Sequence, residues 1–128
     1  MRTLEFAALA KRASREVRSL SDEVRTGVLN TFADLLVLRK EGILEANAED
    51  LRAAEEGGMS QAFLDRLKLT GSRIDGIAQG VREIAAMEDP LRRVLEERTL
   101  SCGVHLRKIT VPMGVIGIIF ESRPNVSA

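Results

Sequence analysis

Polar and charged side chains follow directly on the longest apolar run of the sequence, Val111 to Phe120. Ligands of open α/β sheets bind beyond the carboxyl ends of the strands, so cofactor-binding residues are expected at this position. The candidates are Phe120, Glu121, Ser122 and Pro124. Arg123 lies among them, and its guanidinium matches the geometry of a phosphate group through two parallel hydrogen bonds. We predict that Arg123 holds a substrate or cofactor phosphate, with a solvated loop arginine as the alternative.

One cysteine, Cys102, and one histidine, His105, are the only residues of their types. They are three positions apart, and at the two-residue period of a strand their side chains point to opposite faces. A Cys-His catalytic dyad is therefore not expected. No metal site is predicted, because His105 has no second histidine to share a metal with. A single thiol forms no internal disulfide, which favours a reducing, cytoplasmic compartment.

Glycines also precede the polar segment, at Gly114 and Gly117. A dinucleotide-binding fingerprint needs three glycines across a strand-to-helix turn. These two do not form that pattern, so classical phosphate cradling by a glycine-rich loop is not predicted.

The elements that position these residues belong to a chain of ordinary globular composition. The 128 residues are 45% hydrophobic and 30% charged. Nineteen basic residues balance nineteen acidic ones, so no strong field exists to attract nucleic acid or an anionic membrane. The apolar run before Glu121 is far shorter than the roughly 18 residues of a membrane span. The first ten residues lack the layout of a signal peptide.

Helices are predicted over residues 1–90, because apolar residues recur at intervals of three and four. We expect N-caps at Ser21, Ser60 and Ser72, a helix start after Gly42, and a left-handed helix end at Gly57-Gly58. The stripes expected to be buried are Phe6, Leu9, Ala10, Ala13, Val17 and Leu20; Val24, Val28, Phe32, Leu35 and Leu36; Ile43, Leu44 and Leu51; Phe63, Leu64 and Leu67; and Ile74, Ile77, Ala78, Val81, Ile84 and Ala85.

A β-hairpin is predicted over residues 91–112. Its arms start at Val94 and Val104, and Ser101-Cys102-Gly103 supplies the turn. The apolar positions change phase between Leu106 and Ile109, which predicts a bulge there.

A buried parallel strand is expected at residues 115–120, which are apolar on both faces. The fold class is therefore α/β: a helical region (1–90), a hairpin (91–112) and the start of an α/β domain (113–128). A parallel neighbour needs a crossover of a dozen or more residues, and eight follow Phe120. We therefore expect the chain to stop where a second half begins.

Four segments carry a family resemblance. The longest is VPMGVIGIIFESRPNV at 111–126, supported by ILEANAEDL at 43–51, MSQAFLDRLKLT at 59–70 and DPLRRV at 89–94. Together they resemble the amino-terminal region of the γ-glutamyl phosphate reductases, also called glutamate-5-semialdehyde dehydrogenases. That family has the aldehyde dehydrogenase fold. The resemblance covers nearly the whole chain and implies an amino-terminal fragment of such an enzyme.

The resemblance implies an NADPH-dependent oxidoreductase of L-proline biosynthesis, which converts L-glutamyl 5-phosphate into L-glutamate 5-semialdehyde and phosphate. It implies a cysteine nucleophile from a later region rather than Cys102, so the isolated chain is expected to be inactive. It also implies an oligomer contact through the hairpin. Aldehyde dehydrogenases place an asparagine just beyond the corresponding strand, which makes Asn125 the candidate oxyanion donor. The alternative for Asn125 is a turn residue after Pro124.

Two other functions remain open on the sequence. One is an NAD(P)-dependent aldehyde dehydrogenase of the same superfamily, which would oxidise free aldehydes without releasing phosphate. The other is a helical interaction module without catalytic chemistry.

Overall fold

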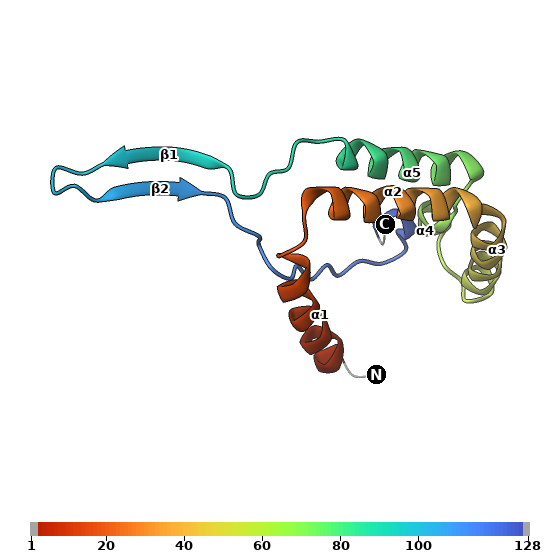
Figure 1. Ribbon diagram of the computed structural model, residues 1–128. Helices are drawn as coiled ribbons and strands as arrows, with labels where there is room; N and C mark the ends of the chain where they lie inside the picture. The colour runs from red at the N-terminus through yellow and green to blue at the C-terminus, as the bar shows by residue number, and fades with distance from the viewer. Residues whose placement is uncertain (1–2, 127–128) are drawn as a thin grey trace. The chain divides into compact units, whose positions relative to one another are not determined.

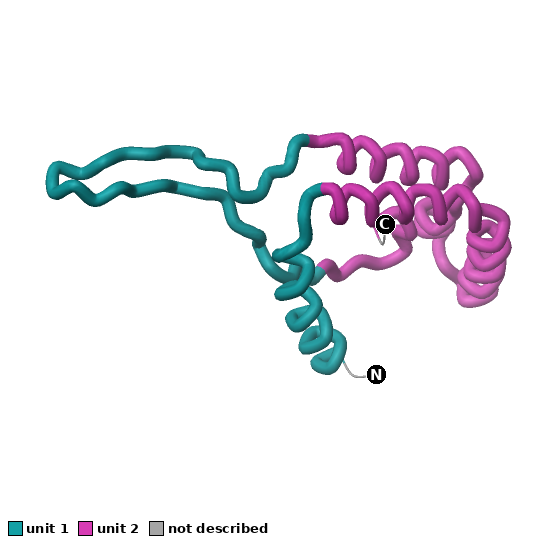
Figure 2. Tube along the Cα trace, viewed as in Figure 1, with its two compact units in different colours: residues 1–22, 88–117 teal, residues 23–87, 118–128 magenta. Residues whose placement is uncertain are grey.

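The computed structural model describes residues 3–126, which form five α-helices, a two-stranded antiparallel sheet and a short 3₁₀ helix (Figure 1). The predicted α/β class is confirmed. The chain folds into two compact units: residues 1–22 with 88–117, and residues 23–87 with 118–128 (Figure 2).

The packing centre of the unit of residues 23–87 and 118–128 lies between α2 (Asp22–Leu38) and α5 (Gly71–Ala85). The two helices run antiparallel and side by side (Figure 1). Ala33 of α2 and Ala78 of α5 are fully buried. Small side chains at a contact let two helix axes approach closely. One ion pair joins the two helices, Arg82 with Asp34 at 2.7 Å, and Lys40, just beyond the end of α2, pairs with Asp75 of α5 at 2.5 Å.

The buried stripe of α2 differs from the predicted one. Leu36 packs toward α5 as predicted, but Leu29 and Ala33 accompany it there, whereas Val28 stays 61% exposed and Phe32 36% exposed. Two neighbouring faces of α2 are apolar, so periodicity alone leaves the choice between them open. The small residue at position 33 selects the face on which α5 can pack.

α3 (Lys40–Glu56) begins directly after Arg39, so Gly42 lies inside the helix rather than before it as expected. The predicted helix end at Gly57-Gly58 is confirmed, with Gly58 at φ 75°. Two hydrogen bonds close this end: the Met59 N–H donates to the Ala54 carbonyl, and the Gly58 N–H donates to the Glu55 carbonyl, both at 3.0 Å. This is the Schellman arrangement, which needs a residue in the left-handed region.

α4 (Gln61–Leu67) follows Ser60, which occupies the expected N-cap position. The N-cap of α5 is Thr70, whose Oγ1 accepts a hydrogen bond from the Arg73 N–H at 3.2 Å. Ser72, the predicted cap, lies instead in the first turn of α5, 3.0 Å from Thr70 Oγ1. Both hydroxyl residues suit a cap locally, but only Thr70 has the extended backbone that a cap requires.

The unit of residues 1–22 and 88–117 contains α1 (Thr3–Val17) and the predicted hairpin, which is formed by β1 (Val94–Thr99) and β2 (His105–Ile109). The Leu100 N–H donates to the Val104 carbonyl at 2.9 Å, which closes a three-residue loop. Gly103 adopts φ 87°, as the last residue of such a loop requires. The turn is where the sequence predicted it.

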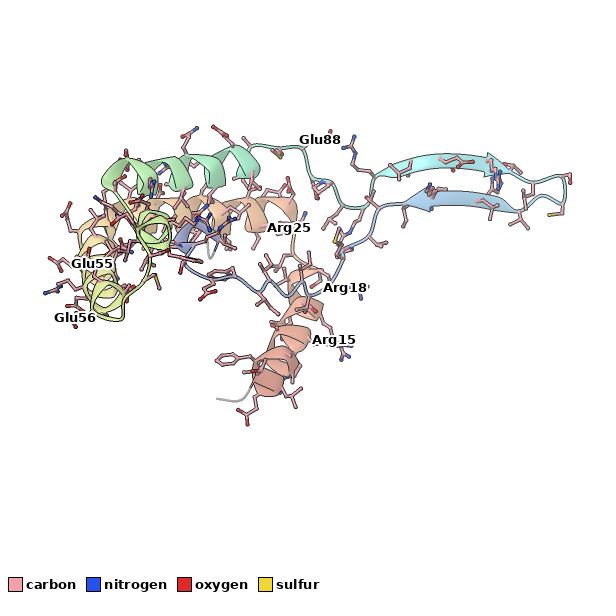
Figure 3. The ribbon with its side chains drawn as sticks, turned by 180° about the vertical axis from the view of Figure 1, so that it is seen from behind. Arg15, Arg18, Arg25, Glu55, Glu56 and Glu88 are labelled. Carbon is pink, nitrogen blue, oxygen red and sulfur yellow. The ribbon has the colours of Figure 1, made fainter. Side chains whose placement is uncertain are left out.

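The hairpin register shifts between Val94 and Glu96. The extra residue, Leu95, therefore lies in the first arm, and the bulge predicted between Leu106 and Ile109 of the second arm is wrong. Opposite charges face each other across the strands, with Glu96 opposite Lys108 and Glu97 opposite Arg107. Such pairs stabilise a hairpin modestly. The side chains of both strands are exposed (Figure 3).

The strand expected at residues 115–120 is absent from the described structure. This segment has no regular secondary structure, and Ile119 is fully exposed. A parallel strand forms only when its N–H and C=O groups meet a neighbouring strand. Within residues 3–126, the only paired strands are β1 and β2, which pair with each other.

Candidate functional site

A cavity of about 790 Å³ opens between α4, the connection to α5, the first half of α5 and the segment around Pro124. All of these elements belong to the same compact unit. The cavity is lined by Ala62, Asp65, Arg66, Lys68, Leu69, Arg73, Gly76, Ile77, Arg123, Pro124 and Asn125.

The charge of the lining is strongly one-sided, with four basic side chains against the single carboxylate of Asp65. Within residues 3–126, neither Lys68 nor Arg123 forms an ion pair with a carboxylate. The Arg66 guanidinium lies 5.5 Å from the centre of the Phe63 ring. Because no carboxylate within residues 3–126 pairs with Lys68 or Arg123, the lining favours an anion over a cation.

Arg73 has a mainly structural role in this lining. Its Nη1 donates to the carbonyl oxygen of Asp65 at 3.1 Å and also to that of Lys68. It therefore ties the end of α4 to the start of α5. Its charge still contributes to the field in the cavity, but part of its donor capacity is already used.

The segment that brings Arg123 and Asn125 to the cavity is a sharp turn. Ser122 adopts φ 52°, and residues Pro124–Val126 then form a 3₁₀ helix in which the Val126 N–H donates to the Arg123 carbonyl at 3.0 Å. The Asn125 side chain is exposed and makes no hydrogen bond to any of residues 3–126. Its amide N–H groups are therefore available to a ligand, as an oxyanion donor requires.

Pro124 also lines a second, apolar cavity of about 300 Å³. The other residues around this cavity are Phe32, Leu36, Ile43, Leu69, Ile74 and Ile77. The proline ring thus lies between the helical core and the charged cavity. Its two neighbours in the chain, Arg123 and Asn125, line the charged cavity but not the apolar one.

The structure brings together three of the site residues predicted from sequence: Arg123, Pro124 and Asn125 line one cavity. Phe120, Glu121 and Ser122 precede them and do not line it; Phe120 is 47% exposed. Their cofactor-binding role stays a prediction.

Sequence reasoning missed three cavity residues, Arg66, Lys68 and Arg73. They lie close together along the chain, around the end of a short helix, and this basic cluster was the available signal. Its significance appears only when the fold places it next to Arg123, fifty or more positions later.

Neither the thiol of Cys102 nor the imidazole of His105 lines this cavity. Cys102 is exposed in the hairpin turn. His105 Nδ1 lies 2.9 Å from Thr99 Oγ1, so its hydrogen-bonding partner is the cross-strand threonine. Among residues 3–126, no cluster of three or more histidine, cysteine, aspartate or glutamate side chains is arranged to hold a metal ion. In the same range, the helices are all too short or too polar to traverse a lipid bilayer.

No family model matches the sequence. A curated γ-glutamyl phosphate reductase from Campylobacter curvus is 46% identical over 124 residues, which are 97% of this chain and 28% of the relative. The solved γ-glutamyl phosphate reductase structure from Thermotoga maritima matches with a TM-score of 0.92 and 33% identity, over 97% of this chain and 30% of that one. The Saccharomyces cerevisiae structure matches with a TM-score of 0.89 and 35% identity, over 96% of this chain and 31% of that one.

The chain therefore spans less than a third of the length of these relatives. The matches run over almost every residue of this chain, at 33–46% sequence identity, and confirm the resemblance seen in the four sequence segments. Over nearly its whole length, the chain is similar in sequence and backbone to the amino-terminal part of the γ-glutamyl phosphate reductases.

Proposed function

We propose that these residues form the phosphate-binding wall of a cytoplasmic, NADPH-dependent reductase that converts L-glutamyl 5-phosphate into L-glutamate 5-semialdehyde and phosphate in L-proline biosynthesis. The observation that carries the proposal is the cavity in which four basic side chains meet the free amide of Asn125. An acyl phosphate needs both features, because it carries a dianion next to a carbonyl that becomes an oxyanion during reaction.

The proposed roles follow from the groups that each side chain offers. Lys68 and Arg123 hold the phosphate of the substrate, Lys68 as a compact charge and Arg123 through its planar fork. Asn125 donates its amide N–H to the oxyanion that forms when a thiolate attacks the acyl carbon. The attacking cysteine is proposed to come from a later region of the whole enzyme, as the family resemblance implies; Cys102 does not line the cavity.

NADPH, when bound, supplies the hydride that reduces the resulting thioester. Phe120, Glu121 and Ser122, which come just before Arg123 in the chain, are the residues proposed to contact it. The half-exposed ring of Phe120 offers a flat apolar surface of the kind that such a cofactor needs.

The hairpin is proposed as an oligomer contact. Each strand of a two-stranded sheet has one edge whose backbone groups have no partner strand. Pairing of one such edge with a second copy would satisfy these groups.

The experiment is a hybrid enzyme in which these residues replace the corresponding segment of the Campylobacter curvus relative. Activity is followed in the reverse direction, as NADP reduction in the presence of glutamate 5-semialdehyde and phosphate. We expect turnover that requires phosphate. Arg123→Ala should raise the KM for phosphate about 10- to 100-fold, as expected for the loss of a hydrogen bond between charged groups.

Arg52→Ala is the matched control, because Arg52 is an exposed arginine of α3 that does not line the cavity. This variant should leave the KM for phosphate unchanged. Turnover of a free aldehyde without phosphate would contradict the proposal and favour an aldehyde dehydrogenase of the same superfamily.

A further inference from the structure

Asn47 of α3 is the one buried polar side chain among residues 3–126, at 6% exposure. It lies on the face of α3 that also carries the half-buried Ile43, Leu44 and Leu51. A buried amide in such surroundings needs hydrogen-bonding partners to offset its loss of water.

Both ends of the Asn47 amide bind the backbone of the connection between α4 and α5. The Nδ2 donates to the Leu67 carbonyl at 3.0 Å, and the Oδ1 accepts from the Leu69 N–H at 2.7 Å. These two groups flank Lys68, so the side chain of Asn47 pairs with the connection as a neighbouring strand would.

The backbone groups of Lys68 are held as well. Its N–H donates to the Leu64 carbonyl at 2.9 Å, and its carbonyl accepts from the Arg73 guanidinium. Lys68 has an extended backbone with φ −64° and ψ 123°, in which successive side chains alternate sides. Leu67 and Leu69 are accordingly half-buried, while Lys68 is exposed and lines the charged cavity.

We propose that Asn47 is a positioning residue for anion binding: it fixes the backbone on either side of Lys68 and so holds the ammonium group of Lys68 at the cavity. This inference rests on the proposed phosphate-binding function. Asn47 does not line the cavity itself. An asparagine suits the role because its side chain offers a donor and an acceptor on one short planar group. An alanine offers neither, so the connection must be ordered when the ligand binds.

The test is a double-mutant cycle on the 128-residue chain, with sulfate as the probe and binding followed by NMR titration. Asn47→Ala should weaken sulfate binding about three- to tenfold, the cost of ordering a loosened segment. Lys68→Ala should weaken it at least as much. The double variant should bind sulfate as Lys68→Ala does, because Asn47 acts through Lys68.

Val81→Ala is the matched control for stability, because Val81 is buried at 7% exposure and does not line the cavity. Both Val81→Ala and Asn47→Ala should lower the melting temperature. Only Asn47→Ala should weaken sulfate binding and increase the fast motion of the Lys68 amide measured by ¹⁵N relaxation.

Three results would overturn the inference. In the first, Val81→Ala weakens sulfate binding as much as Asn47→Ala does, or Asn47→Ala weakens binding equally with and without Lys68. Either outcome would mean that the role of Asn47 is purely structural. In the second, Lys68→Ala weakens binding but Asn47→Ala does not, so the positioning role alone fails. In the third, Lys68→Ala leaves binding unchanged, so the proposed phosphate-binding role fails together with the inference.

Discussion

Lys68 and Arg123 reach the same cavity through different local structures. Lys68 lies on an extended segment whose backbone groups are bound on each side by Asn47, Leu64 and Arg73. Arg123 follows Ser122, which is held in the left-handed region, where a non-glycine residue costs roughly 1–2 kcal/mol. The backbone at Lys68 is thus held by hydrogen bonds, whereas Arg123 follows a strained turn, and both residues line the same cavity.

Gly76 gives a residue-scale prediction about the cavity. It lies inside α5 and lines the cavity, and a Cβ at this position would meet no atom within 4 Å. Gly76→Ala should therefore stabilise the helix by about 0.5–1 kcal/mol, measured as the free energy of unfolding in urea. The added methyl group should also weaken sulfate binding, because it takes space in the cavity.

Gly80 provides the comparison. It also lies inside α5 with no atom within 4 Å of a built Cβ, but it does not line the cavity. Gly80→Ala should give a similar gain in stability and leave sulfate binding unchanged. Equal effects of the two substitutions on binding would argue against a ligand in this cavity.

Much of the site could be predicted from local sequence, because Arg123, Pro124 and Asn125 are consecutive. The rest could not, because Lys68 and Arg123 meet only through the packing of α4, α5 and the 3₁₀ helix. Asn47 carried no local signal at all. A single asparagine on the apolar face of a helix does not indicate which distant backbone groups it will bind.

At the scale of elements, local patterns located the helices and the hairpin, because the periods of 3.6 and 2 residues depend on near neighbours. The local patterns did not decide which of two similar faces is buried or which of two similar residues caps a helix. The face of α2 that is buried depends on the contact between the small side chains of Ala33 and Ala78. The residue that caps α5 depends on which of the two hydroxyl residues has an extended backbone. The strand at 115–120 was predicted from its apolar residues, but a strand also needs a partner.

Thr110 gives an element-scale prediction at the base of the hairpin. Its Oγ1 accepts from the Arg93 N–H at 2.9 Å and donates to the Pro90 carbonyl at 2.6 Å. Thr110→Val keeps the shape of the side chain and removes both hydrogen bonds, which should cost about 1 kcal/mol of local stability. Hydrogen exchange at the Arg93 amide should become faster.

Thr110→Ser restores the hydroxyl and should return the exchange rate of the Arg93 amide close to that of the unmodified chain. If serine and valine accelerate exchange equally, the two hydrogen bonds do not hold the base of the hairpin.

At the scale of the whole molecule, the chain exposes far more surface than a folded monomer of its size. Its accessible area is 10,169 Å² for a mass of 14.1 kDa, whereas a typical folded monomer of that mass exposes about 6,700 Å². The buried apolar residues lie in one unit: Ala33, Leu64, Ile74, Ala78, Val81 and Ala85. The described residues of the other unit include none that is buried.

This contrast predicts unequal stability in the two units. Amides of α2 and α5 should show the slowest hydrogen exchange, while those of α1, β1 and β2 should exchange faster, because their hydrogen bonds are not covered by buried side chains. Native-state exchange measured by NMR at low protein concentration tests this. Slow exchange in β1 and β2 at that concentration would show that burial does not govern local stability here.

The irregular segment at residues 111–120 has a further consequence. Its backbone forms no hydrogen bond to other backbone groups within residues 3–126, and a protease binds its substrate as an extended chain with free amide and carbonyl groups. Limited digestion with an enzyme that cleaves after apolar residues should therefore cut this segment first. The cut would break the covalent link between the helices and the segment that carries Arg123 and Asn125, and it would leave the core of α2 and α5 intact.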